Sequence, residues 1–85
     1  MKIATVRSVC ECQARLGADL DERYVAIRGW AKEPRRGREL PAPANTIGAG
    51  QARFDVAWMC PVCTRNVLRS FEASGLAFRE ERKAG

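Results

Sequence analysis

Three stretches of the chain alternate hydrophobic with polar residues, which is the period of a β-strand that buries one face. They cover residues 2–9, 24–32 and 53–59. In the last stretch Phe54, Val56 and Trp58 share one side, and we predict that this side faces the core. The pattern therefore predicts a small antiparallel sheet of about three strands.

Residues 64–74 have a different spacing and predict a helix. Val67, Leu68 and Phe71 recur at the interval of one helical face. Gly75 follows at the place where a helix C-terminus favours a residue with positive φ. Residues 13–20 are expected to form a turn or a short helix. Together these elements predict an α+β fold, with a sheet of about three strands plus one C-terminal helix.

Proline and glycine gather in residues 34–52, which predicts a long loop within one domain. We expect that domain to cover residues 1–76 and a charged tail to cover residues 77–85. A chain of 85 residues has room for one small hydrophobic core. Domains of this size usually need a disulfide, a metal ion or a partner to be stable.

The four cysteines form two tight pairs that suit a metal site. The first hook is Cys10-Glu11-Cys12 and the second hook is Cys60-Pro61-Val62-Cys63, with 47 residues between them. Each hook places two sulfurs on one turn, and folding can bring the two turns together around one tetrahedral ion. Because the chain contains no histidine, cysteine is the only soft metal ligand that it offers. We predict that Cys10, Cys12, Cys60 and Cys63 bind one structural Zn²⁺.

Three other roles for the cysteines stay open at this point. Two disulfides would suit a secreted protein, but residues 1–3 lead directly into a polar alternating segment without the core of a signal peptide. A strand, a CxxC pair and a helix are also the local order of a thiol oxidoreductase, which would use Cys60 and Cys63. That reading leaves the first hook without a role. Four unlinked thiols would not explain two close pairs.

The second hook and the strand before it resemble zinc-ribbon domains in the broad sense. The segment Trp58-Met59-Cys60-Pro61-Val62-Cys63 is similar to the W-x-C-P-x-C knuckle of that group. The resemblance implies a zinc-ribbon-like sheet in which the four cysteines are the metal ligands. The chain departs from the group in three ways. The first hook has a single residue between its cysteines, Gln13 and Thr64 stand where a glycine would follow each hook, and the separation of 47 residues between the hooks is long.

The chain is basic, with 15 Lys and Arg against 10 Asp and Glu and a formal net charge of +5. Such a charge is compatible with nucleic acid as a partner but does not require it. Arg35, Arg36 and Arg38 lie in the predicted loop, where they could reach phosphates. A short basic loop is more often simply solvated, and that interpretation stays open.

The second predicted strand has apolar residues on both of its sides. Val25 and Ile27 share one side, and Tyr24, Arg28 and Trp30 share the other. If the first two face the core, the other three form an exposed basic-aromatic strip that could stack unpaired bases or anchor a protein. The alternative is that Tyr24 and Trp30 pack beneath the long loop.

The sequence shows no pairing of a nucleophile with a base, and a closed site of four cysteines leaves the metal no open position for water. We therefore expect a non-enzymatic, zinc-stabilised binding module without a small-molecule substrate, in the first place a nucleic-acid-associated or transcription-type adaptor. The alternatives are a structural or assembly subunit of a large complex such as a phage-like particle, and a CxxC thiol oxidoreductase. No charge-free run approaches the ~20 residues of a membrane span, so we expect a cytoplasmic protein with no membrane partner.

Overall fold

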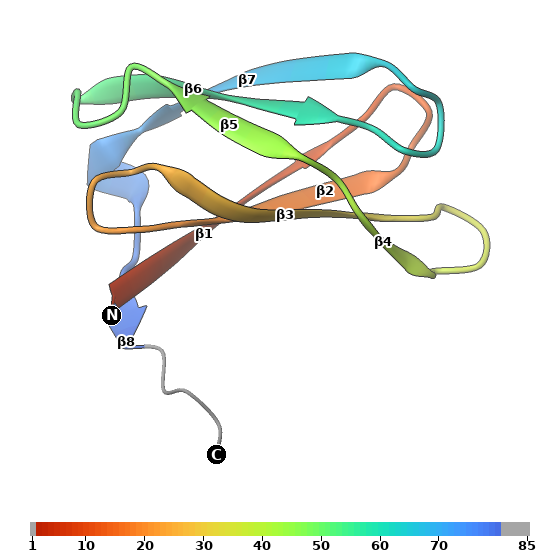
Figure 1. Ribbon diagram of the computed structural model, residues 1–85, viewed down its shortest axis with the longest axis horizontal. Helices are drawn as coiled ribbons and strands as arrows, with labels where there is room; N and C mark the ends of the chain where they lie inside the picture. The colour runs from red at the N-terminus through yellow and green to blue at the C-terminus, as the bar shows by residue number, and fades with distance from the viewer. Residues whose placement is uncertain (1, 81–85) are drawn as a thin grey trace.

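Two antiparallel β-sheets lie one above the other and contain most of the chain (Figure 1). The structure is a computed structural model, and it describes residues 2–80. One sheet has five strands in the order β4-β3-β2-β1-β8, and the other has three strands in the order β5-β6-β7. The strands are β1 (Lys2–Val9), β2 (Arg15–Leu20), β3 (Ala26–Lys32), β4 (Glu39–Pro41), β5 (Ala44–Ile47), β6 (Arg53–Met59), β7 (Asn66–Glu72) and β8 (Arg79–Glu80).

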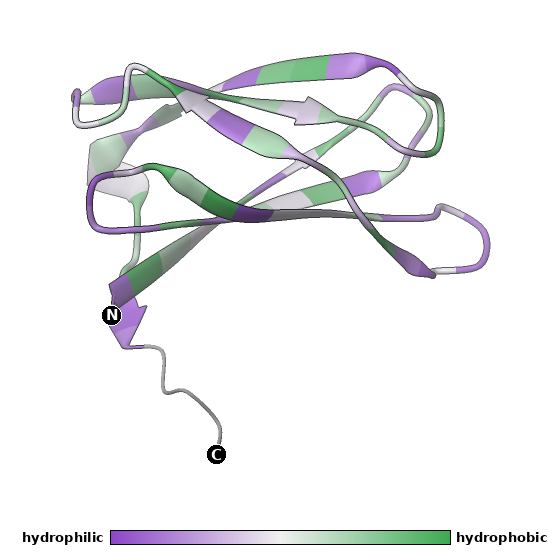
Figure 2. Ribbon diagram, viewed as in Figure 1, coloured by the Kyte–Doolittle hydropathy of each residue, from purple (hydrophilic) through white to green (hydrophobic). Residues whose placement is uncertain are grey.

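The hydrophobic core lies between the two sheets. Strand β6 contributes Phe54, Val56 and Trp58, each at most 2% exposed, as their alternation predicts. The five-stranded sheet contributes a matching set from β1 and β2: Val6, Leu16, Ala18 and Leu20. Hydrophobic and hydrophilic positions alternate along several strands, and the turns after β2 and β3 are hydrophilic (Figure 2). The predicted bounds of the first and third strands, residues 2–9 and 53–59, are confirmed.

The predicted α+β fold is wrong, because residues 2–80 contain no α-helix and the fold is all-β. The expected C-terminal helix is strand β7, followed by a single 3₁₀ turn at Ala73–Gly75. Val67 and Phe71 are four residues apart, and four is also a multiple of the strand period, so both still share one face. In the register of β6 and β7 they lie opposite Trp58 and Phe54. Leu68, which a helix would have placed beside them, is 55% exposed.

The segment of residues 13–20 is also a strand rather than a turn or helix. All of residues 16–20 are buried, and Leu16, Ala18 and Leu20 belong to the hydrophobic core at alternate positions. Because Gly17 and Ala18 are small, this alternation is weak in the sequence. Strand β2 occupies the centre of the five-stranded sheet, between β1 and β3.

The segment of residues 34–52, expected as a loop, contains β4 and β5 and carries the chain from one sheet to the other. Between these strands the Ala42 N–H donates to the Gly29 carbonyl (3.1 Å), and the Met59 N–H donates to the Pro43 carbonyl (3.0 Å). The backbones approach so closely that a Cβ on Gly29 would lie 2.2 Å from the Ala42 oxygen. Of the expected charged tail, residues 79–80 form β8 beside β1, and residues 81–85 lie outside the described part of the chain.

Candidate functional site

The four cysteines come together at one end of the molecule. Cys10 follows β1 before the turn into β2, and Cys60 follows β6 before the turn into β7. The Sγ atoms of Cys10 and Cys63 are 3.5 Å apart, those of Cys12 and Cys60 are 3.7 Å apart, and all four lie within 4.8 Å of one another. Four sulfurs bound at ~2.3 Å around a tetrahedral ion would be ~3.8 Å apart. The hooks therefore converge as predicted, at a spacing that can hold one metal ion.

The two hooks share a backbone geometry although they differ in length. The Cys10 carbonyl accepts a hydrogen bond from the Gln13 N–H (2.8 Å), and the Cys60 carbonyl accepts one from the Thr64 N–H (2.8 Å). Gln13 and Thr64 both have positive φ, 76° and 62°. These are the two positions at which the sequence lacks the glycine of zinc-ribbon hooks. Both turns thus place a residue with a side chain in the left-handed conformation, which glycine adopts at the least cost.

The environment of Cys12 favours its protonated form unless a cation is present. Cys10 and Cys60 are 3% and 0% exposed, while Cys12 and Cys63 are half-buried. A hydrogen bond from the Ala14 backbone lowers the pKa of Cys12. Desolvation and hydrogen bonds with the other three cysteines outweigh it and raise that pKa from 9.0 to about 12. A bound metal replaces the thiol protons of the cysteines that bind it, so metal binding at this site releases protons and weakens as the pH falls.

The face of the five-stranded sheet that is turned away from the other sheet is basic. The register brings residues of β1, β2 and β3 into rows across it, such as Arg7, Gly17 and Trp30, and the next row Val9, Arg15 and Lys32. We call it the outer face, and it forms an open hollow of about 770 Å³. Its residues include Thr5, Arg7, Val9, Arg15, Asp19, Arg28, Trp30, Lys32, Glu39 and Arg79.

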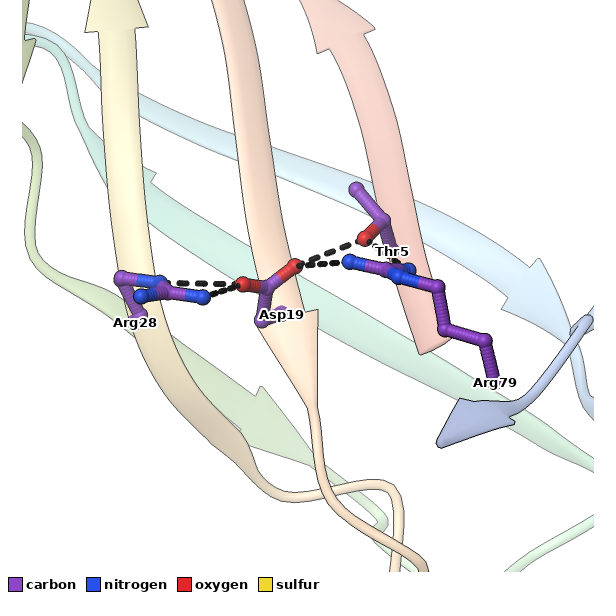
Figure 3. A network of polar contacts seen from close by, with 4 residues as sticks. All are labelled: Thr5, Asp19, Arg28 and Arg79. Atoms are coloured by element: carbon purple, nitrogen blue, oxygen red, sulfur yellow. Dashed lines mark hydrogen bonds and ion pairs between the residues drawn. The ribbon is translucent and has the colours of Figure 1, made fainter. Parts of the chain in front are cut away.

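One buried carboxylate organises part of the outer face (Figure 3). Asp19 is 2% exposed and accepts hydrogen bonds from Thr5 Oγ1 (2.7 Å) and Arg28 Nε (2.9 Å). Arg28 Nη2 also pairs with Asp19, and Arg79 Nη2 lies 3.8 Å from Asp19 Oδ1. Burial by itself raises the pKa of Asp19. The hydrogen bonds from Thr5 and Arg28 and the charges of Arg28 and Arg79 together outweigh it, so the net pKa is lowered.

Three other cations on the outer face are free of such partners. Arg7, Arg15 and Lys32 are exposed, and within residues 2–80 none of them forms an ion pair. These three residues were not predicted from the sequence because they belong to three different strands, one of which was not expected as a strand. The signal that could have found them is the alternation of β1, in which Arg7 lies on the side opposite to the buried Val6.

The sequence-predicted binding residues separate into three places. Arg28 and Trp30 lie on the outer face. Tyr24 does not, because it precedes β3 with a positive φ of 68° and its ring stacks on Phe54, with centroids 5.4 Å apart. The arginines of the turn between β3 and β4 are exposed, and Arg38 pairs with Glu33 (2.7 Å). That turn borders the outer face through Pro34 and Gly37, which line a smaller hollow together with Val9, Arg15 and Lys32.

Comparisons with protein-family models, with curated proteins and with solved structures returned no match. Among residues 2–80 no helix is long and apolar enough to cross a membrane. The function is therefore inferred from the geometry of the cysteine cluster and of the outer face.

We expect one divalent ion such as Zn²⁺ to bind per chain, and Cys12→Ser to weaken that binding by more than ~100-fold. Removing a residue that only hydrogen-bonds to a metal ligand already lowers metal affinity by ~10–100-fold. Cys12 would itself be a ligand, so its loss should lower the affinity further. Native mass spectrometry gives the stoichiometry, and competition with a chromophoric chelator gives the affinity. Glu11→Gln, an exposed change in the same hook, serves as the control and should leave the affinity nearly unchanged. Equal affinity of wild type and Cys12→Ser would contradict the site.

Thr64→Gly should raise the free energy of unfolding of the metal-loaded protein by ~1 kcal/mol. A side chain in the left-handed region costs ~1–2 kcal/mol, and the change sacrifices only an exposed hydrogen bond from Thr64 Oγ1 to the Cys63 carbonyl. Urea unfolding at saturating metal measures the difference. Ser74→Gly is the matched control, because Ser74 is exposed and its φ is not positive, so glycine there should bring no gain. A stabilisation of the same size in both variants would refute the explanation by strain.

Asp19→Asn should lower the free energy of unfolding by ~2 kcal/mol at neutral pH, because it removes the charged acceptor of the hydrogen bonds from Thr5 and Arg28 and leaves the exposed Arg28 without its carboxylate partner. The pKa of Asp19 is lowered on folding, so its stabilising contribution is present above its ordinary value of 3.8 and is lost as the pH falls through the lower, folded value. The difference between wild type and variant should therefore be constant from pH 7 to about pH 5 and shrink below about pH 4. Urea unfolding of both proteins across this range isolates Asp19, because the titration of the cysteines is common to both. A difference that does not change with pH would show that the carboxylate charge is not responsible.

Proposed function

We propose that this protein is a non-enzymatic binding module, stabilised by one structural Zn²⁺, that binds nucleic acid on the outer face. The cysteine cluster supports the metal part of the proposal. Zinc accepts four thiolates in a tetrahedron, which is the donor set and spacing of the two hooks. A site closed by four protein ligands has no open position for a substrate or an activated water, which favours a structural role.

The pairing of sulfurs across the hooks also supports a shared ion over a CxxC oxidoreductase. The two hydrogen-bonded sulfur pairs, Cys10 with Cys63 and Cys12 with Cys60, each join one cysteine of the first hook to one of the second. A redox motif needs the two sulfurs of one hook, whereas here all four sulfurs form one cluster.

The observation that carries the binding proposal is the set of unpaired cations on the outer face. Arg7, Arg15 and Lys32 come from three adjacent strands, and their charges have no carboxylate partner within the described chain. Arg28 and Arg79 border them on the other side of the hollow. Four thiolates and one Zn²⁺ together carry −2, so the loaded chain keeps a formal charge of about +3 from its sequence value of +5. A concentration of cations on one face is the electrostatic feature that attracts phosphates.

The test is the salt dependence of oligonucleotide binding, measured by fluorescence anisotropy. The triple variant Arg7→Gln/Arg15→Gln/Lys32→Gln should bind more weakly, and the slope of log affinity against log salt should fall by ~2. Each lost contact with a single-stranded phosphate removes ~0.7 from that slope.

The matched control removes three exposed arginines elsewhere, as Arg23→Gln/Arg53→Gln/Arg65→Gln. It changes the net charge by the same amount but should leave the slope close to that of wild type. No binding at low salt would refute the proposed function, and equal losses in both triple variants would refute the outer face as the site.

A further inference from the structure

The indole of Trp30 lies against the outer face at a place where the neighbouring strand has no side chain. Trp30 is opposite Gly17 in the register of β2 and β3. A Cβ on Gly17 would lie 2.4 Å from Trp30 Cε2 and 2.5 Å from both Cζ2 and Nε1, so the ring occupies the space that a side chain would need. One side of the indole is therefore packed on the sheet, while the residue is half-buried and lines the hollow.

The strand beneath this ring is fixed from the opposite side by the second tryptophan. Trp58 Nε1 donates a hydrogen bond to the Gly17 carbonyl (3.0 Å), and Trp58 is 1% exposed. Gly17 thus lies between an indole on the outer face and an indole in the core. Trp58 is two residues before Cys60. Strand β6 therefore contains the residue that contacts Gly17 beneath Trp30 and leads directly into the second hook. The ring of Trp30 is consequently supported by the sheet on one side.

Cations surround Trp30 along and across the sheet. Arg7 lies opposite Gly17 on β1, in the same row as Trp30. The row toward the hooks contains Arg15 and Lys32, and the row on the other side contains Arg28. Alternate residues of a strand are ~6.7 Å apart, which is similar to the span of one nucleotide in an extended strand. An aromatic ring beside unpaired cations can therefore stack a base while Arg7, Arg15 and Lys32 contact the neighbouring phosphates.

We propose that Trp30 is a stacking platform for an unpaired base and that the outer face binds single-stranded rather than double-stranded nucleic acid. The proposal rests on the function proposed above and specifies its substrate. In a duplex both faces of every internal base are covered by neighbouring bases, so a ring on the protein can stack only on an unpaired base. Within residues 2–80 the outer face is also an open hollow on a sheet and has no α-helix that could enter a major groove.

The experiment compares a single-stranded thymidine oligonucleotide of ten nucleotides with a duplex of the same length and salt conditions. Wild type should bind the single strand more tightly, and binding should quench tryptophan fluorescence. Trp30→Leu should weaken single-strand binding by ~5- to 150-fold, which is the range for removing one stacked base. The salt slope should not change, because no phosphate contact is lost. Trp30→Phe should retain part of the affinity.

Gly17→Ala is a second variant that leaves the indole in the chain but displaces it from the sheet. It should lower single-strand affinity with an unchanged salt slope. Ile47→Ala, an exposed apolar residue of the three-stranded sheet, is the control and should bind as wild type does. Metal stoichiometry and the circular dichroism spectrum establish that each variant is folded, and Trp30→Phe stands in where Trp30→Leu fails this check.

The outcomes separate the two proposals. Salt-dependent binding in which single strand and duplex are equal, or in which Trp30→Leu and Trp30→Phe both bind as wild type does, overturns the stacking platform and leaves the proposed function standing. No binding of either oligonucleotide at low salt overturns both.

Discussion

The convergence of two hairpin turns on one cluster of four sulfurs is the constraint on which the rest of the molecule depends. The first hook belongs to the hairpin of β1 and β2, and the second belongs to the hairpin of β6 and β7, so each sheet contributes one turn. An ion bound there joins the two sheets at one end. The second connection between the sheets is the crossing between β4 and β5, where the Ala42 N–H donates to the Gly29 carbonyl and the Met59 N–H, one residue before Cys60, donates to the Pro43 carbonyl. A core made from short strands and many alanines gains most from such a joint, because small domains bury little apolar surface.

Strand β2 connects this metal-binding end to the outer face. Its Leu16, Ala18 and Leu20 point into the core, and the alternate positions Arg15, Gly17 and Asp19 belong to the other side. Each of these three has a different role on that side. Arg15 presents an unpaired charge, Gly17 makes room for the Trp30 ring, and Asp19 holds Arg28 in place from a buried position. The central strand thus positions both the aromatic ring and the cations beside it.

The buried carboxylate also explains why the cations of the outer face are not equivalent. Arg28 and Arg79 compensate the charge of Asp19, so much of their attraction for an added anion is already used. Arg7, Arg15 and Lys32 lack such a partner among residues 2–80. Exposed ion pairs and free surface charges contribute little to stability, which makes these three more informative about binding than about folding.

Local sequence pattern is enough to predict the strands with clear alternation and the pairing of the hooks. Strands β1 and β6 follow from the alternation of hydrophobic and polar residues. Two tight cysteine pairs predict one cluster, because a shared metal ion is the arrangement that uses all four sulfurs together. Local pattern did not determine β7, since residues spaced by four fit both a helix and a strand, and only the register against Phe54 and Trp58 separates the two. Nor did it determine β2, β4 and β5, whose small residues and prolines carry a weak pattern.

The outer face was decided by the tertiary structure alone. Arg7, Arg15 and Lys32 are distant in sequence and become neighbours only when three strands pair in register. Tyr24 and Trp30 look equivalent on one predicted strand, yet a positive φ turns Tyr24 toward Phe54 while Trp30 stays on the sheet. Local chemistry fixes which residues are able to bind a metal or a base, whereas strand register and backbone turns decide which of them meet.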